Sequence, residues 1–254
     1  MAAISFDGLT KRYGGLTAVS NLRLDVAEGE ILGFLGLNGA GKTTSIRMLL
    51  DLLRPTSGRA SIFGHDCQAD GLAARDHVGY LPSEMGIYPD LTGHQVLKLL
   101  GSLNHRAVEQ KYVGELQERL QLPDSDLRRK LREYNSGMKR KLGIIQAFQA
   151  DPPLLILDEP TEGLDPLMQD SFYELLSEVQ RRGRTVFFSS HVLSEVERVC
   201  QRVALLRQGE LVLLSTVEEC RKLAPRDVHV TFVADVAAPL GLPLTWVIHT
   251  GPRS

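Results

Sequence analysis

The chain has few cysteines, a net charge close to zero and no long apolar run. Its three cysteines among 254 residues are widely spaced and form no C-x-x-C pair, which argues against a disulfide framework and predicts free thiols in a reducing compartment. No apolar run approaches the roughly 18 residues that a membrane-spanning helix needs. The N-terminus has no basic region followed by an apolar core, so no secretory signal is expected. A formal net charge of −2 gives no general attraction to nucleic acid. We therefore expect a soluble cytoplasmic protein with no nucleic-acid partner.

The most informative stretch is G-L-N-G-A-G-K-T-T at residues 36–44, here called the phosphate loop. It follows an apolar run typical of a strand and precedes apolar residues spaced along one helix face. Its glycines allow backbone N–H groups to form a nest for phosphate oxygens, and the helix N-terminus adds partial positive charge. Lys42 is expected to reach the β- and γ-phosphates, and Thr43 to offer its hydroxyl to Mg²⁺. The predicted nucleotide-binding residues here are Gly36, Asn38, Gly39, Ala40, Gly41, Lys42, Thr43 and Thr44.

Two adjacent carboxylates close a later apolar stretch. Residues 154–157 are all apolar, which favours a central parallel strand covered on both faces. Asp158 and Glu159 follow at the carboxyl end, where open parallel sheets place their ligands. Because neighbouring strand residues point to opposite sides, we expect Asp158 to face Mg²⁺ and Glu159 to face an attacking water as general base. The alternative is a solvated acidic loop.

The order of strand and helix signals predicts an α/β fold interrupted by a helical insert. We expect an ATP-binding core from residues 1–86 and 151–223, and a helical subdomain over residues 87–150, where Thr92 and Gln95 match a capping box. Residues 224–254 look like a short and truncated C-terminal extension. The predicted strands are residues 4–9, 22–26, 58–63, 78–81, 154–157, 185–189, 203–206 and 210–214. The predicted helices include residues 107–122, 137–150, 167–182 and 193–200.

Four motifs in this order resemble the ATP-binding subunit of an ABC transporter. They are the phosphate loop, D-E-P at residues 158–160, G-L-D-P at 163–166 and S-S-H at 189–191, and the likeness runs from about residue 4 to residue 223. The resemblance implies a P-loop NTPase core with a mostly parallel sheet, an antiparallel portion and an inserted helical subdomain. It also implies ATP hydrolysis with Mg²⁺.

The resemblance assigns roles to individual residues. Tyr13 matches the aromatic residue that stacks on adenine, with packing against a strand edge as the alternative. His191 follows a strand as the family's γ-phosphate sensor does, and Asp165 lies in the loop that crosses to the opposite subunit. Glu159, His191 and Lys42 are then the catalytic residues, and the predicted metal ligands are Thr43 and Asp158.

The family's signature segment is expected one helix before Asp158, and residues 134–139 (Y-N-S-G-M-K) take that place. Their sequence resembles the Y-S-x-G-M-K variant of the drug, lipid and polysaccharide export branch rather than L-S-G-G-Q. Asn135 stands where the family has a serine, and Gly137 matches the core of the motif. An asparagine amide can donate a hydrogen bond, and Ser136 lies beside it, so all three remain predicted ATP-binding residues.

Other positions also depart from the family pattern. Ser83 aligns with a glutamine that touches Mg²⁺ and the attacking water in the family, which puts a metal role for Ser83 in doubt. Glu162 stands where the family usually has a small residue. After the signature segment, residues 139–141 (K-R-K) are either directed at phosphate or part of a solvated helix face.

By the same resemblance, two cassettes meet head to tail and enclose two ATP molecules, so a second cassette, identical or different, is an expected partner. Separate transmembrane permease subunits are the other partner. Residues 85–89 are expected to contact the permease, with a buried inter-subdomain loop as the alternative. The chain would then be peripheral on the inner face of the cell membrane, and the signature wording favours export.

Two alternative functions stay open. The chain could be a catalytically weakened cassette in an asymmetric heterodimer, because Asn135 would affect the partner's ATP site and Ser83 its own. It could also be a non-transport ABC ATPase acting on nucleic acid or ribosomes. Such proteins usually carry two cassettes or long coiled coils, and this chain has one cassette and no heptads.

Overall fold

The computed structural model describes residues 2–86 and 89–223. These residues contain two sheets, one of which is antiparallel. Its strand order is β2-β1-β4-β5, and its strands are β1 (Ala2–Tyr13), β2 (Leu16–Ala27), β4 (Ser57–Ile62) and β5 (His65–Asp66). The first two strands run further than predicted, since pairing with β2 carries β1 through its polar end to Tyr13. Polar residues on an exposed face do not end a strand whose backbone stays paired.

The second sheet has six strands in the order β10-β9-β3-β8-β7-β6. Its members are β3 (Ile31–Leu35), β6 (Val78–Leu81), β7 (Leu154–Asp158), β8 (Thr185–Ser190), β9 (Arg202–Arg207) and β10 (Glu210–Thr216). All neighbours are parallel except β10, which forms a hairpin with β9. Gln208 and Gly209 have φ of 51° and 83° in that turn, as a two-residue type I′ hairpin requires.

Burial explains why the first four residues of β7 are all apolar. Leu154 and Ile156 pack into the cluster between the two sheets, while Leu155 and Leu157 pack into the cluster on the opposite face. The expectation of a central strand covered on both faces is confirmed. Asp158 is the last residue of the strand, and Glu159 follows it directly.

The helices mostly agree with the sequence signals. They are α1 (Lys42–Leu49), α2 (Gly71–Arg75), α3 (Gly93–Ser102), α4 (Gln110–Arg119), α5 (Asp124–Leu127), α6 (Ser136–Phe148), α7 (Pro166–Arg181), α8 (Leu193–Val199) and α9 (Val217–Leu223), with a 3₁₀ turn η1 (Leu131–Glu133). The Thr92–Gln95 capping box is present with both of its hydrogen bonds. The sequence signals did not predict α2, α5 or α9; α2 and α5 are too short to show a helical period.

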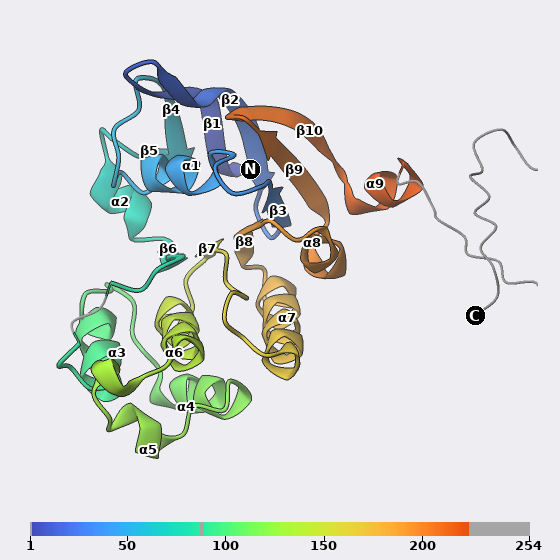
Figure 1. Ribbon diagram of the computed structural model, residues 1–254. Helices are drawn as coiled ribbons and strands as arrows, with labels where there is room; N and C mark the ends of the chain where they lie inside the picture. Colours follow the sequence, from blue (N-terminus) through green and yellow to red (C-terminus); the bar gives the residue numbers. More distant parts are fainter. Residues whose placement is uncertain (1, 87–88, 224–254) are drawn as a thin grey trace, which may run out of the picture. The chain divides into compact units, whose positions relative to one another are not determined.

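Figure 1 shows α3 to α6 grouped on the side of β6 and β7 that lies away from the antiparallel sheet. Within the described residues, 93–148 carry helices only, and the first 222 residues form one compact unit. A boundary between core and helical subdomain at residues 87 and 150 stays a prediction. The expected permease contact includes Ile87 and Tyr88, and the C-terminal extension covers residues 224–254; these lie outside the described residues. Among the residues that the structure describes, no helix is long and apolar enough to cross a membrane.

Candidate active site

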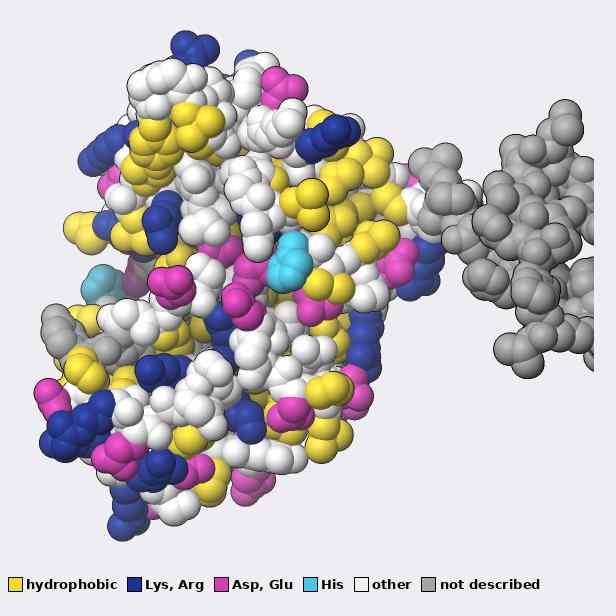
Figure 2. Space-filling model, in the orientation of Figure 1, with side chains coloured by type: hydrophobic (Ala, Val, Ile, Leu, Met, Phe, Trp, Pro, Cys, Tyr) yellow, Lys and Arg dark blue, Asp and Glu magenta, His cyan; other side chains and the backbone are white. Residues whose placement is uncertain are grey.

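Four parallel strands bring the predicted residues to one edge of the six-stranded sheet. The phosphate loop follows β3, Glu159 follows β7, His191 follows β8 and Ser83 follows β6 by one residue. The strands are in register at these ends, where Leu35 pairs with Ser190 and Asp158 pairs with Ser189. Figure 2 shows acidic side chains and a histidine gathered in the middle of one face of the molecule.

The phosphate loop has the backbone conformation that its glycines predict. Gly39 and Gly41 have φ of 80° and 108°, and a Cβ on Gly41 would lie 2.6 Å from the carbonyl oxygen of Ala18. At Gly41, only glycine tolerates both the positive φ and the close approach of the Ala18 carbonyl. The Ala40 carbonyl accepts a hydrogen bond from the N–H of Gly209 at 2.9 Å, which ties the loop to the hairpin turn.

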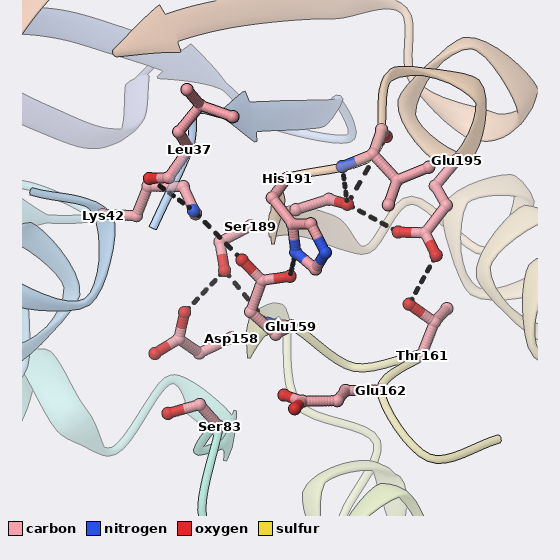
Figure 3. A network of polar contacts seen from close by, with 12 residues as sticks. Leu37, Lys42, Ser83, Asp158, Glu159, Thr161, Glu162, Ser189, His191 and Glu195 are labelled. Atoms are coloured by element: carbon pink, nitrogen blue, oxygen red, sulfur yellow. Dashed lines mark hydrogen bonds and ion pairs between the residues drawn. The ribbon is translucent and has the colours of Figure 1, made fainter. Parts of the chain in front are cut away.

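Lys42, the first residue of α1, turns its side chain back across this loop. Only 5% of its surface is exposed, and Nζ donates to the Gly36 carbonyl at 2.5 Å. Nζ also lies 3.1 Å from Glu159 Oε1, which is ion-pair distance although the angles are not those of a hydrogen bond. The ammonium is therefore held among oxygens inside the loop (Figure 3), where it can meet phosphate.

Glu159 departs from the strand geometry that the sequence suggested. Its φ of 49° places it in the left-handed region, so strand alternation ends at Asp158. The Glu159 N–H donates to Ser189 Oγ at 3.0 Å, which satisfies the turned backbone. Glu159 Oε2 accepts from His191 Nδ1 at 2.8 Å. Because a carboxylate only accepts, Nδ1 carries the proton in this contact.

Asp158 is fully buried, and each carboxylate oxygen has a hydroxyl partner. Thr43 Oγ1 donates to Oδ2 at 2.9 Å, and Ser189 Oγ donates to Oδ1 at 2.6 Å. The pair of oxygen donors from Thr43 and Asp158 suits Mg²⁺, which prefers oxygen ligands and takes few from protein when a substrate supplies phosphates. Among the described residues, no group of three or more acidic, histidine or cysteine side chains is placed to hold a metal ion. The predicted metal pair is thus brought together.

Glu195, in the first turn of α8, was not singled out from the sequence. Its Oε2 accepts from Ser190 Oγ at 2.5 Å, and its Oε1 accepts from Thr161 Oγ1 at 2.7 Å. Glu195 therefore joins the residue before His191 to the loop that follows Glu159, as Figure 3 shows. No local spacing in the sequence marks this residue.

The signature segment presents an exposed helix start. Asn135 is the N-cap of α6, and its Oδ1 accepts from the Met138 N–H at 2.8 Å. Asp165 is the N-cap of α7 in the same way, accepting from the Met168 N–H at 3.0 Å. Both caps are exposed, as is Ser136. Among the described residues, no hydrogen bond or ion pair joins either cap to the phosphate loop.

The remaining candidates stand further from these contacts. Tyr13 ends β1 with 48% of its surface exposed, and Lys11 Nζ lies 5.1 Å from its ring centroid. Ser83 is half-buried, and within the described residues its hydroxyl has no hydrogen bond, while its carbonyl accepts from Arg140 at 2.6 Å. Arg140 is itself buried and donates to backbone carbonyls, so this residue is not part of a solvated helix face.

A sequence model of the ABC transporter family matches residues 19–162, more than half of the chain. The chain belongs to the ABC transporter family. It is similar to the daunorubicin resistance ATP-binding protein DrrA3 of Streptomyces coeruleorubidus, with 36% identity over 252 residues that cover 96% of this chain and 79% of that protein. It is also similar to the bacitracin transport ATP-binding protein BcrA of Enterococcus faecalis, with 38% identity over 86% of this chain and 71% of that protein.

Solved structures give the same result for the fold. The structure of an ATP-binding subunit of an ABC transporter matches with a TM-score of 0.80 and 29% identity, covering 87% of this chain and 92% of that one. A dimeric bacterial ABC transporter cassette matches with a TM-score of 0.77 at 24% identity, covering 84% of this chain and 98% of that one, a likeness that concerns the fold. The predicted ABC ATPase architecture is confirmed, and the chain is an ATP-binding, ATPase subunit of this family.

Proposed function

We propose that the chain binds ATP with Mg²⁺ at the edge of the six-stranded sheet and hydrolyses it with Glu159 as general base, to drive export through separate permease subunits. The observation that carries the proposal is the line of contacts from Lys42 through Glu159 to His191. An ammonium, a carboxylate and an imidazole next to a glycine-rich nest can supply the charge neutralisation and the positioning of water on which phosphoryl transfer depends.

The contacts around Glu159 suggest how ATP binding prepares the site. Lys42 and His191 both contact the Glu159 carboxylate, and a γ-phosphate entering the loop competes for both. Once the phosphate takes these two partners, the carboxylate is left to accept a proton from a water molecule. The side chain of Glu159 is only 12% exposed, which limits its access to bulk solvent.

Thr43 and Asp158 are the proposed Mg²⁺ residues. Ser189 donates to the other oxygen of Asp158 and so holds the carboxylate in one orientation. When bound, Mg²⁺ supplies charge neutralisation for the phosphates. Ser83 lies at the same sheet edge, but its hydroxyl has no contact to Asp158 in the described structure, so Ser83 is not part of this proposal for the metal.

The exposed start of α6 supports the proposal of a second cassette as partner. The start of α6, with Asn135, Ser136 and Gly137, offers backbone N–H groups at a helix N-terminus, which favour an anion. We propose that this start faces ATP in a second cassette, with Asp165 at the same interface and Tyr13 stacked on adenine. The proposal of export is supported by the sequence of the signature segment and by similar proteins whose names describe drug resistance or transport. The chain would then work at the inner face of the cell membrane, bound to the permease.

Steady-state ATPase activity with Mg²⁺ tests the proposal. We expect Glu159→Gln to lower turnover by about 100-fold or more, because a general base contributes 10²–10⁴-fold, and we expect its ATP-bound form to dimerise. Glu115→Gln, an exposed change in α4, is the control and should retain full turnover. Chelation of Mg²⁺ should abolish turnover. Failure of the unchanged protein to bind ATP would contradict the proposal.

A further inference from the structure

Arg140 in α6 is an unusual cation because it is buried and its main partners are backbone carbonyls. Only 6% of the residue is exposed. Its guanidinium donates through Nη1 to the Pro82 carbonyl at 2.9 Å, through Nη2 to the Ser83 carbonyl at 2.6 Å, and through Nε to the Glu162 carbonyl at 3.2 Å. One side chain therefore holds three carbonyls from two loops that are far apart in the sequence.

The chemistry of the guanidinium explains why the position suits arginine. Its planar fork offers N–H groups in several fixed directions, so one group can satisfy three acceptors, and it keeps its charge when buried. Burial lowers the pKa of Arg140, and the nearby carboxylates of Glu162, Asp158 and Glu159 oppose that effect. The Glu162 carboxylate lies 3.9 Å from Nη2 and is 66% exposed, so it adds less than the carbonyls do.

The two loops held by Arg140 belong to the catalytic edge of the same chain. Pro82 and Ser83 follow β6, which pairs with β7. Glu162 lies in the loop after Glu159, and its N–H donates to the Glu159 carbonyl at 3.2 Å. Arg140 itself lies about one helical turn beyond the start of α6, whose N-terminal end is the signature segment.

We propose that Arg140 is a positioning residue that couples the start of α6 to residues 82–83 and residue 162. This inference rests on the proposed function, in which the start of α6 faces the partner's ATP. A shift of either loop in one ATP site is then passed to the helix that contacts the other site. The two ATP sites of a cassette pair are linked through this one side chain in each chain.

The test compares Arg140→Met with the unchanged residue, both in a Glu159→Gln background that does not turn over. Affinity for a fluorescent ATP analogue reports on the chain's own site, and sedimentation with ATP reports on dimerisation. We expect analogue affinity to stay within about twofold and ATP-driven dimerisation to weaken about tenfold, within the range typical of coupling between sites. Arg140→Lys should fall between, because an ammonium lacks the planar fork. Arg128→Met, an exposed arginine paired with Asp124, is the matched control and should match the parent.

Hydrogen exchange supplies a second reading that needs no dimer. In Arg140→Met, amides of the loops after β6 and β7 should exchange about tenfold faster, while β3 and β8 keep their protection. Unchanged exchange in both loops would overturn the proposal, as would wild-type dimerisation of Arg140→Met. A general loss of protection together with lost analogue binding would also overturn it, since Arg140 would then serve only folding. Failure of the parent itself to bind the analogue would instead contradict the proposed function.

Discussion

The two halves of the proposed ATP site differ in how firmly contacts within this chain fix their side chains. On the phosphate-loop side, Lys42 and Asp158 are buried; Lys42 donates to Gly36 in the loop after β3, and Asp158 accepts from Ser189 in β8. On the signature side, Asn135 and Asp165 are exposed, and within the described residues their side chains form hydrogen bonds only to the backbone of the helices that they cap. The first half is assembled by strands that end together, whereas the second consists of helix starts that face outward.

This difference has an energetic consequence. Removing one partner of a buried charge leaves the other charge uncompensated, which costs more than the loss of an exposed contact. Changes on the phosphate-loop side should therefore affect ATP binding and folding stability together. Changes on the signature side should leave ATP binding by the isolated chain unaffected and should alter ATP hydrolysis only when two cassettes meet. Three substitutions, besides Glu159→Gln and Arg140→Met, test that contrast.

Lys42→Met should have the largest effect. The change removes the cation that lies 3.1 Å from Glu159 and that we expect to contact the β- and γ-phosphates. Loss of one charge-assisted hydrogen bond of about 1.5–3 kcal/mol predicts roughly 10- to 100-fold weaker ATP binding. Turnover should fall further, by about 1,000-fold, because the same cation neutralises charge in the transition state. Isothermal titration with ATP and an ATPase assay measure the two effects.

Lys111→Met is the control for Lys42, since Lys111 is 82% exposed on α4 and only loosely paired with Glu115. It should bind and hydrolyse ATP like the unchanged chain. Equal affinity of Lys42→Met and the parent would mean that Lys42 pairs with Glu159 in every state, and that the competition proposed between Glu159 and phosphate does not occur.

Glu195→Ala should have an intermediate effect on the same side. Ser190 is fully buried and Thr161 is 5% exposed, and each loses its carboxylate acceptor in this variant. A buried hydroxyl without its partner costs about 1–3 kcal/mol, so we expect a lower thermal midpoint and about tenfold lower turnover as Glu159 and His191 lose their alignment. Glu195→Gln should lose less, because an amide oxygen still accepts one hydroxyl. Glu197→Gln, two residues along α8, serves as the control, and equal losses in it would remove any special role for Glu195.

These residues also mark where sequence reasoning succeeded and where it could not. Local patterns located Lys42 and Asp158, because a glycine-rich turn and a strand end leave recognisable sequences, whereas His191 was assigned through the family resemblance. The roles of Glu195 and Arg140 depend on partners 34 and 58 residues away in the sequence, and no local period encodes such contacts. The positive φ of Glu159 was missed for a similar reason, since it is stabilised by Ser189 on the neighbouring strand rather than by a glycine.

Asn135 should give the smallest effect and the sharpest test of the contrast. As the N-cap of α6 it does what a serine does there, since asparagine and serine are about equally good caps. Asn135→Ser should therefore leave the thermal midpoint unchanged and the turnover rate within about twofold of the parent. Asn135→Ala should cost about 1 kcal/mol of stability through the lost cap. Neither variant should change ATP affinity in the monomer, because the residue has no contact with the phosphate loop among the described residues. A threefold or greater rise in turnover in Asn135→Ser would show instead that the asparagine weakens the partner's site. The structural departure at the signature segment would then be a functional one.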